Sequence, residues 1–473
     1  MSALKVAVVG AGPAGIYASD ILSKSGQQVD IDLFERLPAP YGLVRYGVAP
    51  DHPRIKQIIV ALYKILQRGD IRLLGNVEVG RDISIDELEE RYDAVIIATG
   101  ADRDARLDIP GVEATFGAAD FVSWYDGHPD YPRDWPLEAR EVAVLGVGNV
   151  ALDVARVLSK HHDDILSTEI PENVAAVLRD NPVTDVHVFG RRGPAQVKFT
   201  PLELRELGKV ADVDVIVHED DFDFDEGSQK ALRSSKQQQQ VVKTLTQYAS
   251  ADVDSFSASR RIHIHMFESP AEVKLDAGGN ICSLRTERTR LTGDGSVEGT
   301  GEFHEWPVQA VYRAIGYRSS PIPDVPFDEV RGVVPNEGGR VSPGLYATGW
   351  IKRGPVGLIG STKSDAQETI ANLVEDAPKL SHSVSSDVLE LLTERGVPVT
   401  TWHGWELLDA YEQQLGSDFE LRPGTFRERI KVVSREAMTA ISNGTSPGDL
   451  IGKPGELGVP EAADRFDDFT GPR

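Results

Sequence analysis

Two glycine-rich loops in this chain have the spacing of dinucleotide-binding turns. The first covers residues 10–15 (GAGPAG) and follows the short apolar run Lys5–Val9. In a G-x-G-x-x-G turn, the first glycine permits the tight bend, the second lets the backbone approach a pyrophosphate, and the third lets helix and strand pack closely. The start of the following helix then offers free N–H groups and its positive dipole end to the phosphates.

Glu35 indicates which dinucleotide the first loop would bind. It ends the next apolar run, Asp30–Phe34, 20 residues after the last glycine of the loop. A carboxylate there accepts hydrogen bonds from both ribose hydroxyls but repels a 2′-phosphate, so the loop predicts a site for FAD or NAD and not for NADP. The alternative is a tight strand–helix turn without a ligand. The residues of this predicted site are Gly10, Gly12, Ala14, Gly15 and Glu35.

The second loop covers residues 146–151 (GVGNVA) and lacks an acidic partner. It follows the run Glu141–Leu145, and the next run, Asp185–Phe189, leads into Gly190-Arg191-Arg192. Arginine binds phosphate through two parallel charge-assisted hydrogen bonds, so two guanidiniums at this place favour a 2′-phosphate. The loop therefore predicts an NADP(H) site, with a surface arginine pair in ordinary salt bridges as the alternative. Its residues are Val147, Gly148, Asn149, Val150, Arg191 and Arg192.

Two different dinucleotides in one chain imply hydride transfer from NADPH to the flavin of FAD, with the protein binding and orienting both. The chain has a single cysteine, Cys282, which excludes an internal disulfide, a redox-active cysteine pair and a Cys-ligated metal site. Electrons must therefore leave to an external acceptor. His263 and His265 alternate along a predicted strand with no Cys or carboxylate motif beside them, and we expect no metal site.

The elements that position these loops are those of an α/β fold with parallel sheets. Short Val/Ile-rich runs alternate with helical patterns, and strand–glycine–helix–strand occurs twice, which predicts two Rossmann-like domains. Residues 345–349 (LYATG) resemble residues 95–100 (VIIATG) and predict a strand that returns to the first domain. Helices are expected at 360–374 and 404–415. The Pro/Trp-rich stretch 124–136 predicts an irregular surface loop, and the acidic run 219–226 a solvated one.

Composition excludes several classes of protein. The 473 residues are 40% hydrophobic and 26% charged, as in soluble globular proteins of roughly two to four domains. The net charge of -24 repels phosphate backbones, so a general nucleic-acid role is excluded. No apolar run approaches the roughly 20 residues of a membrane span. The opening MSALKVAVVG has no targeting signal, so we expect a cytoplasmic protein, or one of the mitochondrial matrix.

Two longer strings are more specific than either loop. Residues 41–53 (YGLVRYGVAPDHP) and 349–360 (GWIKRGPVGLIG) resemble signatures of adrenodoxin-reductase-type ferredoxin–NADP reductases. The resemblance spans about residues 3–440, includes Arg427–Ala440, and is greatest to the actinobacterial ferredoxin/flavodoxin reductases. Ser361-Thr362 departs from the expected Thr-Asn.

The resemblance implies a domain organisation. In that family an N-terminal FAD domain is completed by the C-terminal part, and the NADP domain is inserted between them. Here residues 1–105 would be the first part of the FAD-binding domain and 106–320 the NADP-binding domain. Residues 321–443 would complete the FAD domain and add C-terminal helices, and 444–473 would be a flexible tail rich in Gly, Pro and Asp.

The resemblance also implies site residues. The FAD contacts would be Ala14, Glu35, Leu43, Val79, Trp350, Gly357, Leu358 and Ile359, and the NADP contacts Val147 to Val150, Arg191, Arg192, Glu203 and Gly357. His52 and Glu206 would lie near the nicotinamide. Because hydride transfer needs no acid or base, we assign them tuning and positioning roles. A turn residue before Pro53 and a solvated helix position are the alternatives for these two.

The expected function is that of an FAD-dependent ferredoxin–NADP(+) reductase, which moves hydride between NADPH and FAD and single electrons to a ferredoxin or flavodoxin. An NADPH-dependent flavin monooxygenase is the alternative enzyme, against which the 41–53 string argues. A redox-sensing or assembly protein that binds NADP without turnover is the non-enzymatic alternative. An acidic carrier would need a local basic face, for which the candidates are Lys198, Arg205 and Lys209, or Lys352 and Arg353.

Overall fold

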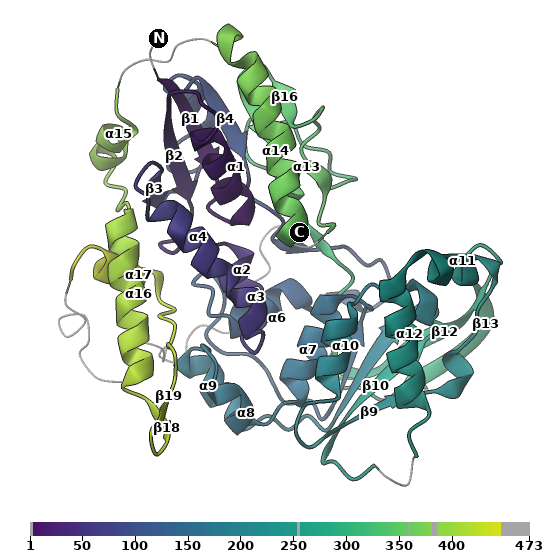
Figure 1. The fold of residues 1–473 in the computed structure, drawn as a ribbon. Coiled ribbons are helices and arrows are strands. Elements are labelled where there is room, and N and C mark those ends of the chain that lie inside the picture. Colours follow the sequence, from purple (N-terminus) through teal and green to yellow (C-terminus); the bar gives the residue numbers. More distant parts are fainter. Residues whose placement is uncertain (1–2, 253–255, 358, 381–385, 446–473) are drawn as a thin grey trace.

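A first six-stranded sheet is built from both ends of the chain (Figure 1). The computed structural model describes residues 3–445 apart from 253–255, 358 and 381–385. The strands lie in the order β16 (Arg340–Ser342), β17 (Leu345–Ala347), β4 (Ala94–Ile97), β1 (Leu4–Val9), β2 (Val29–Glu35) and β3 (Arg72–Gly75). All neighbours are parallel except β16 with β17. The strand predicted to return to the first domain is confirmed, because Leu345 pairs with Val95 beside β1.

Helices α1 (Pro13–Ser23), α4 (Ile58–Leu66) and α14 (Ile359–Asp376) cover one face of this sheet. The apolar side chains of β1 and β4 on that face pack against the apolar faces of these helices and of α16 (Trp402–Ser417). The short helices α2 (Leu43–Tyr46) and α3 (Pro53–Lys56) lie beside α4, and α5 (Ile85–Glu89) and α13 (Trp350–Arg353) pack on the opposite face of the sheet. A capping box of Ser84 and Glu87 begins α5.

The second six-stranded sheet is parallel throughout. Its order is β6 (Phe116–Gly117), β14 (Ala310–Arg313), β7 (Glu141–Leu145), β8 (Asp185–Gly190), β10 (Arg260–Met266) and β9 (Val213–Val217). Strands β14 and β7 are apolar on both faces, as expected for a parallel sheet covered on both sides. The chain passes between the two sheets at β5 (Arg103–Asp104) and β15 (Tyr317–Arg318), which pair with one another.

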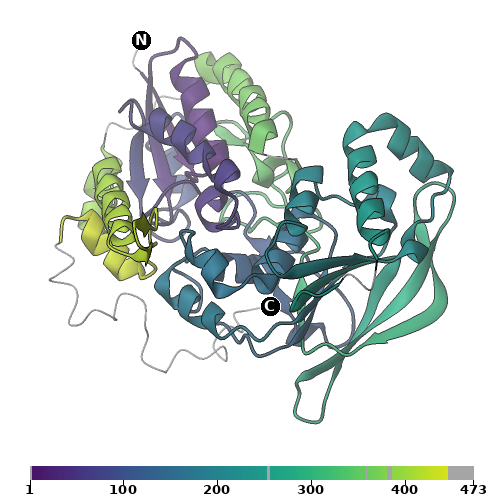
Figure 2. The ribbon, with the colours of Figure 1, turned by 60° about the horizontal axis from the view of Figure 1, so that its bottom comes forward.

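Different layers cover the two faces of the second sheet (Figure 2). One face carries α6 (Ala118–Tyr125), α7 (Asn149–Ser159), α10 (Pro201–Leu207) and α12 (Lys236–Ala249). The other carries a three-stranded antiparallel sheet of β11 (Glu268–Leu275), β12 (Ile281–Leu291) and β13 (Val297–Trp306). The connections add α8 (His162–Leu166), α9 (Glu172–Arg179) and α11 (Glu226–Ser234).

The C-terminal segment contacts both the domain of the first sheet and the domain of the second sheet. They are α15 (Val388–Glu394), α16 and α17 (Arg435–Ser442), with the hairpin β18 (Glu420–Arg422) and β19 (Thr425–Phe426). Arg45, beside the first sheet, makes a buried two-pronged ion pair with Glu412 of α16. Lys431 is 1% exposed and reaches Asp126 and Glu169 of the second domain. The predicted helix at 404–415 is therefore real, and longer than expected.

The predicted surface loop at 124–136 is wrong. Trp124 and Tyr125 end helix α6, and both are buried. The Trp135 side chain is buried too and donates from Nε1 to the hydroxyl of Tyr312 at 3.1 Å. Proline and tryptophan indicate irregular backbone but do not show whether it is buried or exposed. Aromatic side chains have a large apolar surface, and burying it stabilises a core.

The acidic run at 219–226 is mostly exposed, as predicted, but Asp221 is buried and accepts a hydrogen bond from Arg288. Within the part of the chain that the structure describes, no helix has the length and apolar character of a membrane span. The tail prediction for 444–473 falls almost wholly outside the described residues.

Candidate functional site

The first glycine loop is shaped by contacts that only glycine permits. Gly10 has φ 110°, and a Cβ there would lie 2.6 Å from the carbonyl oxygen of Ala98. A Cβ on Gly15 would overlap the carbonyl oxygen of Gly10, because helix α1 packs directly on the loop. Gly12 is different, since its nearest neighbour would be the Cα of Gly42 at 3.9 Å. The loop is therefore tight at both ends and open at its middle glycine, where a phosphate would approach.

Glu35 lies against this loop and is 7% exposed. Its Oε2 accepts a hydrogen bond from the backbone N–H of Ala11 at 2.9 Å, and its Oε1 accepts one from Leu37 at 3.1 Å. Burial raises the pKa of Glu35, and these two hydrogen bonds oppose the rise. Each carboxylate oxygen keeps acceptor capacity, so the side chain can also bind hydroxyl groups.

Segments far apart in the sequence form the walls around the start of α1. A Cβ on Gly349 would lie 2.6 Å from the Cβ of Ala14, so the turn before Trp350 contacts the loop helix. The Trp350 ring is half-buried, 6.3 Å from that of Tyr317. The close approach of Gly42 to Gly12 brings Leu43 to the same place.

The remaining predicted FAD contacts belong to two segments, one at Val79 and one at residues 357–359. The N–H of Val77 donates to the carbonyl of Glu35, which brings half-buried Val79 to this edge of the sheet. Gly357 is exposed and has φ 90°, a conformation that favours glycine. Leu358 lies outside the described residues, and the backbone of Ile359 begins α14.

The second glycine loop repeats this design. Gly146 has φ 133°, and a Cβ there would overlap the carbonyl oxygen of Ala314. A Cβ on Gly148 would meet nothing within 4 Å, and no side chain caps the helix that follows. Asn149 Oδ1 accepts the backbone N–H of Thr200 at 2.8 Å, which ties the loop to α10. The loop thus offers an open middle glycine and free N–H groups at the start of α7.

Arg191 and Arg192 follow β8 beside this loop. Arg191 is exposed and Arg192 half-buried, and neither pairs with a carboxylate within the described ranges. Burial lowers the pKa of Arg192, and the neighbouring Arg191 lowers it further. The backbone is anchored by Thr289, whose hydroxyl donates to the carbonyl of Arg191 at 2.7 Å. The salt-bridge alternative is therefore wrong, and two unpaired guanidiniums stand where a phosphate would bind.

His52 joins the two halves of the molecule. It lies in the turn before α3, is 4% exposed, and contacts Glu206 of α10 between Nδ1 and Oε2 at 2.9 Å. Its Nε2 lies 2.8 Å from Oδ1 of Asp153 on α7, in a hydrogen bond. Glu203 Oε2 also lies 2.8 Å from this nitrogen, as a second carboxylate contact. The predicted His52–Glu206 pair is thus in contact, and their role stays a prediction.

Charges around His52 decide its protonation. Burial lowers the pKa of His52, but the contacts with Asp153 and Glu203 raise it more strongly, to about 10. Arg156 opposes this rise, because its Nη2 lies 2.7 Å from His52 Nε2. Since three carboxylates outweigh one guanidinium, we assign an imidazolium at neutral pH.

Asp51, Asp153 and Arg156 belong to this cluster and were not predicted as site residues. Arg156 makes a two-pronged ion pair with Asp51, at 2.7 and 2.8 Å. The sequence carries a signal for them, because Asp51 falls within the 41–53 string and the other two are three residues apart on one face of the loop helix.

Of the candidate docking cations, Lys198, Arg205 and Lys209 are exposed and form no ion pair with any described residue. Lys352 is 7% exposed, with Nζ 3.1 Å from Asp365 and 2.6 Å from Glu368 of α14. These three exposed cations lie on α10 and on the segments directly before and after it, whereas Lys352 is held by carboxylates of its own domain.

Comparison with known proteins gives consistent matches. Residues 4–193 match the family described as pyridine nucleotide-disulphide oxidoreductase. Over 464 residues the chain is 37% identical to NADPH-ferredoxin reductase FprA of Mycobacterium tuberculosis, and the match covers 93% of this chain and 99% of that protein. It is 37% identical over 440 residues to the mitochondrial NADPH:adrenodoxin oxidoreductase of Arabidopsis thaliana, covering 87% and 91%. The structure of M. tuberculosis FprA in complex with NADPH superposes with a TM-score of 0.86, at 36% identity, over 94% of this chain and 100% of that one.

Proposed function

The chain belongs to the family of the NADPH:adrenodoxin oxidoreductases and NADPH-ferredoxin reductases, and from this premise we propose how its residues perform that family's reaction. The protein is an FAD-dependent NADPH–ferredoxin reductase. FAD, when bound, accepts hydride from NADPH and passes electrons singly to a one-electron carrier. The observation that carries the assignment of residues is the contrast between Glu35 at one loop and the unpaired Arg191 and Arg192 at the other.

Residues 1–105 and 321–443 form the FAD-binding domain in this proposal. Glu35 holds the ribose hydroxyls, the open Gly12 admits the pyrophosphate, and the start of α1 at Ala14 supplies N–H groups. Trp350, Leu43 and Val79 form the wall, and Gly357, Leu358 and Ile359 contact the flavin. The N-terminal end of α14 favours negative charge near these residues.

Residues 106–320 form the NADP-binding domain. The pyrophosphate lies on the open Gly148 and the start of α7, where Val147, Asn149 and Val150 surround it. Arg191 and Arg192 bind the 2′-phosphate, which selects NADPH over NADH. Glu203, whose Oε2 lies 2.8 Å from His52 Nε2, contacts the nicotinamide end of the ligand.

His52 and Glu206 position the nicotinamide in this assignment. The protonated His52 is held between carboxylates of α7 and α10, so it keeps the two domains in register. Glu203, Glu206 and Asp153 together carry more charge than the cations beside them, and this field stabilises positive charge on the oxidised nicotinamide.

The electron acceptor docks on Lys198, Arg205 and Lys209. Ferredoxins and flavodoxins are acidic, and a net charge of -24 repels them at long range. A contact therefore depends on a local basic face, whose attraction acts within a Debye length of about 8–10 Å. Arg205 directly precedes Glu206, which places this face next to the His52 cluster.

The experiment is an anaerobic titration of the purified protein with NADPH, followed by flavin absorbance. We expect a flavin spectrum that bleaches at one equivalent of NADPH, and reoxidation by ferredoxin or flavodoxin. A colourless protein would contradict the proposal. Rapid reoxidation by oxygen with hydroxylation of an organic substrate would instead favour the flavin monooxygenase.

We also infer a cytoplasmic location. A chain with the single cysteine Cys282 cannot form an internal disulfide, which suits a reducing compartment. Cell fractionation with an antibody against the protein would test this, and recovery in an oxidising compartment would contradict it.

A further inference from the structure

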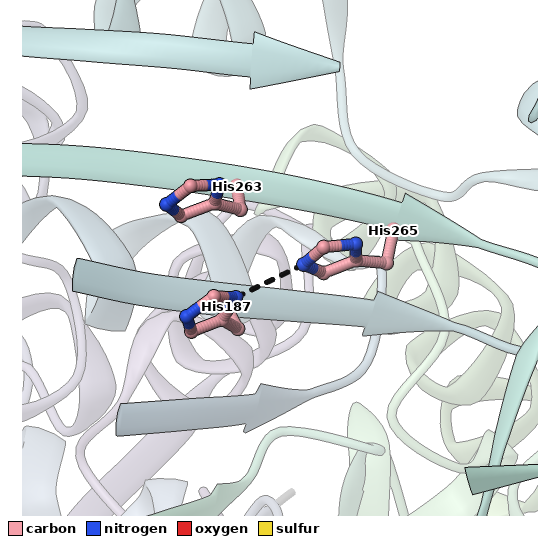
Figure 3. A group of neighbouring side chains, drawn as sticks. All are labelled: His187, His263 and His265. Carbon is pink, nitrogen blue, oxygen red and sulfur yellow. Dashed lines mark hydrogen bonds between the residues drawn. The ribbon is translucent and has the colours of Figure 1, made fainter. Parts of the chain in front are cut away.

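Three histidines gather on one face of the second sheet, away from the glycine loops. His187 lies on β8, and His263 and His265 lie on the neighbouring strand β10 (Figure 3). The strands are parallel, with His263 paired to His187 and His265 paired to Phe189. Because side chains alternate between the faces of a sheet, the three imidazoles share one side.

The nitrogens of this histidine cluster are close enough to share an ion. One nitrogen from each ring lies within 4.8 Å of the others, and His187 Nδ1 is 3.0 Å from His265 Nε2. The rings of His187 and His263 stack with centroids 4.5 Å apart. Three nitrogens at about 2.0–2.1 Å from one tetrahedral zinc lie roughly 3.4 Å apart. The three rings lie within 14° of parallel, so the side chains must rotate to direct these nitrogens at one ion.

Neighbouring groups support the same chemistry. His263 Nε2 lies 3.0 Å from Oδ1 of Asp185, the carboxylate–histidine contact that orients metal ligands. Asp185 is itself held by Arg261 at 2.8 Å. Glu141 Oε2 lies 3.8 Å from His187 Nε2, the ring nitrogen that does not contact His265, and can orient the His187 ring in the same way.

The histidine cluster is largely buried but can be reached from solvent. Burial lowers the pKa of all three imidazoles, that of His187 to about 4. Neutral imidazole is the form that binds metals. The side chains of His187 and His263 are 13% and 17% exposed, which leaves an entry path from solvent.

We propose that His187, His263 and His265 form a binding site for a divalent transition metal of the zinc class. Imidazole ligands favour Zn²⁺, Cu²⁺ and Ni²⁺ over Mg²⁺ or Ca²⁺. The sequence-based expectation of no metal site considered only the two histidines of β10, and strand pairing adds the third. The other cluster with suitable atoms, at His52, differs because the Arg156 guanidinium already lies among its ligands.

The metal would join two strands of the NADP-binding domain and take no part in electron transfer. His187 is four residues before Arg191, about 13 Å along an extended strand. Its face of the sheet is the one covered by β11–β13, where the Trp306 ring packs against His265 with centroids 4.4 Å apart. An ion that binds only the folded state stabilises it, so the metal would raise the thermal unfolding midpoint of this domain.

The test is calorimetric titration of the full-length, FAD-loaded protein with Zn²⁺, and a parallel Co²⁺ titration followed by visible absorbance. We expect one equivalent of Zn²⁺ and the intense absorbance of four-coordinate Co²⁺. His187→Gln and His263→Gln should each weaken Zn²⁺ binding by at least roughly tenfold, because even the loss of a residue that only contacts a metal ligand weakens binding about that much. His403→Gln, at a 78% exposed side chain on α16, is the matched control and should bind as wild type does.

Thermal unfolding gives a second readout that does not depend on activity. Zn²⁺ should raise the midpoint of the wild type and of His403→Gln, and leave that of His263→Gln unchanged. Flavin content and circular dichroism verify that each variant is folded, and partly exposed His187 and His263 are chosen over buried His265 for that reason. Zn²⁺ binding that is absent in the wild type, or equal in all variants, would overturn the proposal.

Discussion

Nδ1 of His52 lies 2.9 Å from a carboxylate oxygen of Glu206, although the two residues belong to different domains, each built on its own sheet. His52 precedes α3 beside the first sheet, and Glu206 lies on α10 over the second. Asp153 and Glu203 contact the other ring nitrogen from the same side. This single imidazole therefore couples the alignment of the two dinucleotide loops to its own protonation.

Replacing His52 should slow flavin reduction and remove a pH-dependent contribution to the stability of the fold. The pKa of His52 is about 10 in the folded protein against an ordinary value of 6.5, so protonation stabilises the fold. This contribution is fully present below about pH 6.5 and is lost progressively as pH rises through 10. We expect the stability difference between wild type and His52→Gln to shrink over that range in denaturant unfolding, with flavin content retained. A difference independent of pH would exclude an imidazolium.

Arg191→Ala combined with Arg192→Ala should weaken the binding of NADPH much more than the binding of NADH. Neither guanidinium pairs with a carboxylate among the described residues, so their charge is available to a phosphate. Charge-assisted hydrogen bonds contribute about 1.5–3 kcal/mol each, so two give roughly a 10²-fold or greater preference. Steady-state KM values for both nucleotides measure it. An unchanged NADPH/NADH ratio would contradict the assignment.

Glu35→Ala should lower FAD retention and leave NADP binding nearly intact. The side chain holds the N–H groups of Ala11 and Leu37, so Glu35→Gln is a conservative partner that keeps acceptor capacity at one oxygen. Flavin content after gel filtration and NADP⁺ affinity by calorimetry separate the two effects. Loss of NADP⁺ affinity at full flavin content would mean that the two loops are exchanged.

Local sequence predicted the parts of the fold that local physics determines. The runs at Lys5–Val9 and Glu141–Leu145 became β1 and β7, and the glycines at 10 and 146 adopt positive φ. Two site features were missed because they depend on packing between elements. His187 contacts His263 only because strands β8 and β10 pair. Lys352 is buried because Asp365 and Glu368, which follow it on the separate helix α14, pack against it.

Lys431→Met should destabilise the whole fold. Lys431 and Lys56 are buried with Asp126 and Glu169, with Lys431 Nζ 3.2 Å from Asp126 Oδ1 and 2.7 Å from Glu169 Oε1. Removing one cation leaves uncompensated buried carboxylate charge, which costs about 3–5 kcal/mol. Denaturant unfolding measures the loss. Exposed Lys209→Met is the control and should change stability by less than about 0.5 kcal/mol.

The docking face gives a prediction that separates electron transfer from hydride transfer. Arg205→Glu combined with Lys209→Glu should slow reduction of a ferredoxin and spare reduction of a small neutral dye. Both residues are exposed and form no ion pair with described residues, so reversing them leaves internal contacts intact. Lys230→Glu combined with Lys236→Glu is the matched control, with the same change in net charge on α11 and α12.

Ionic strength distinguishes local attraction from net repulsion at this face. With a net charge of -24, moderate salt should speed the encounter of wild type with an acidic ferredoxin by screening long-range repulsion. High salt should slow it, because the Debye length falls to about 3 Å at 1 M and the contact itself weakens. The double variant should lose this maximum, whereas the Lys230/Lys236 control should keep it. Equal slowing of ferredoxin and dye would mean that the substitutions damage the NADPH site or the fold, because the dye needs no basic face and still needs reduced flavin.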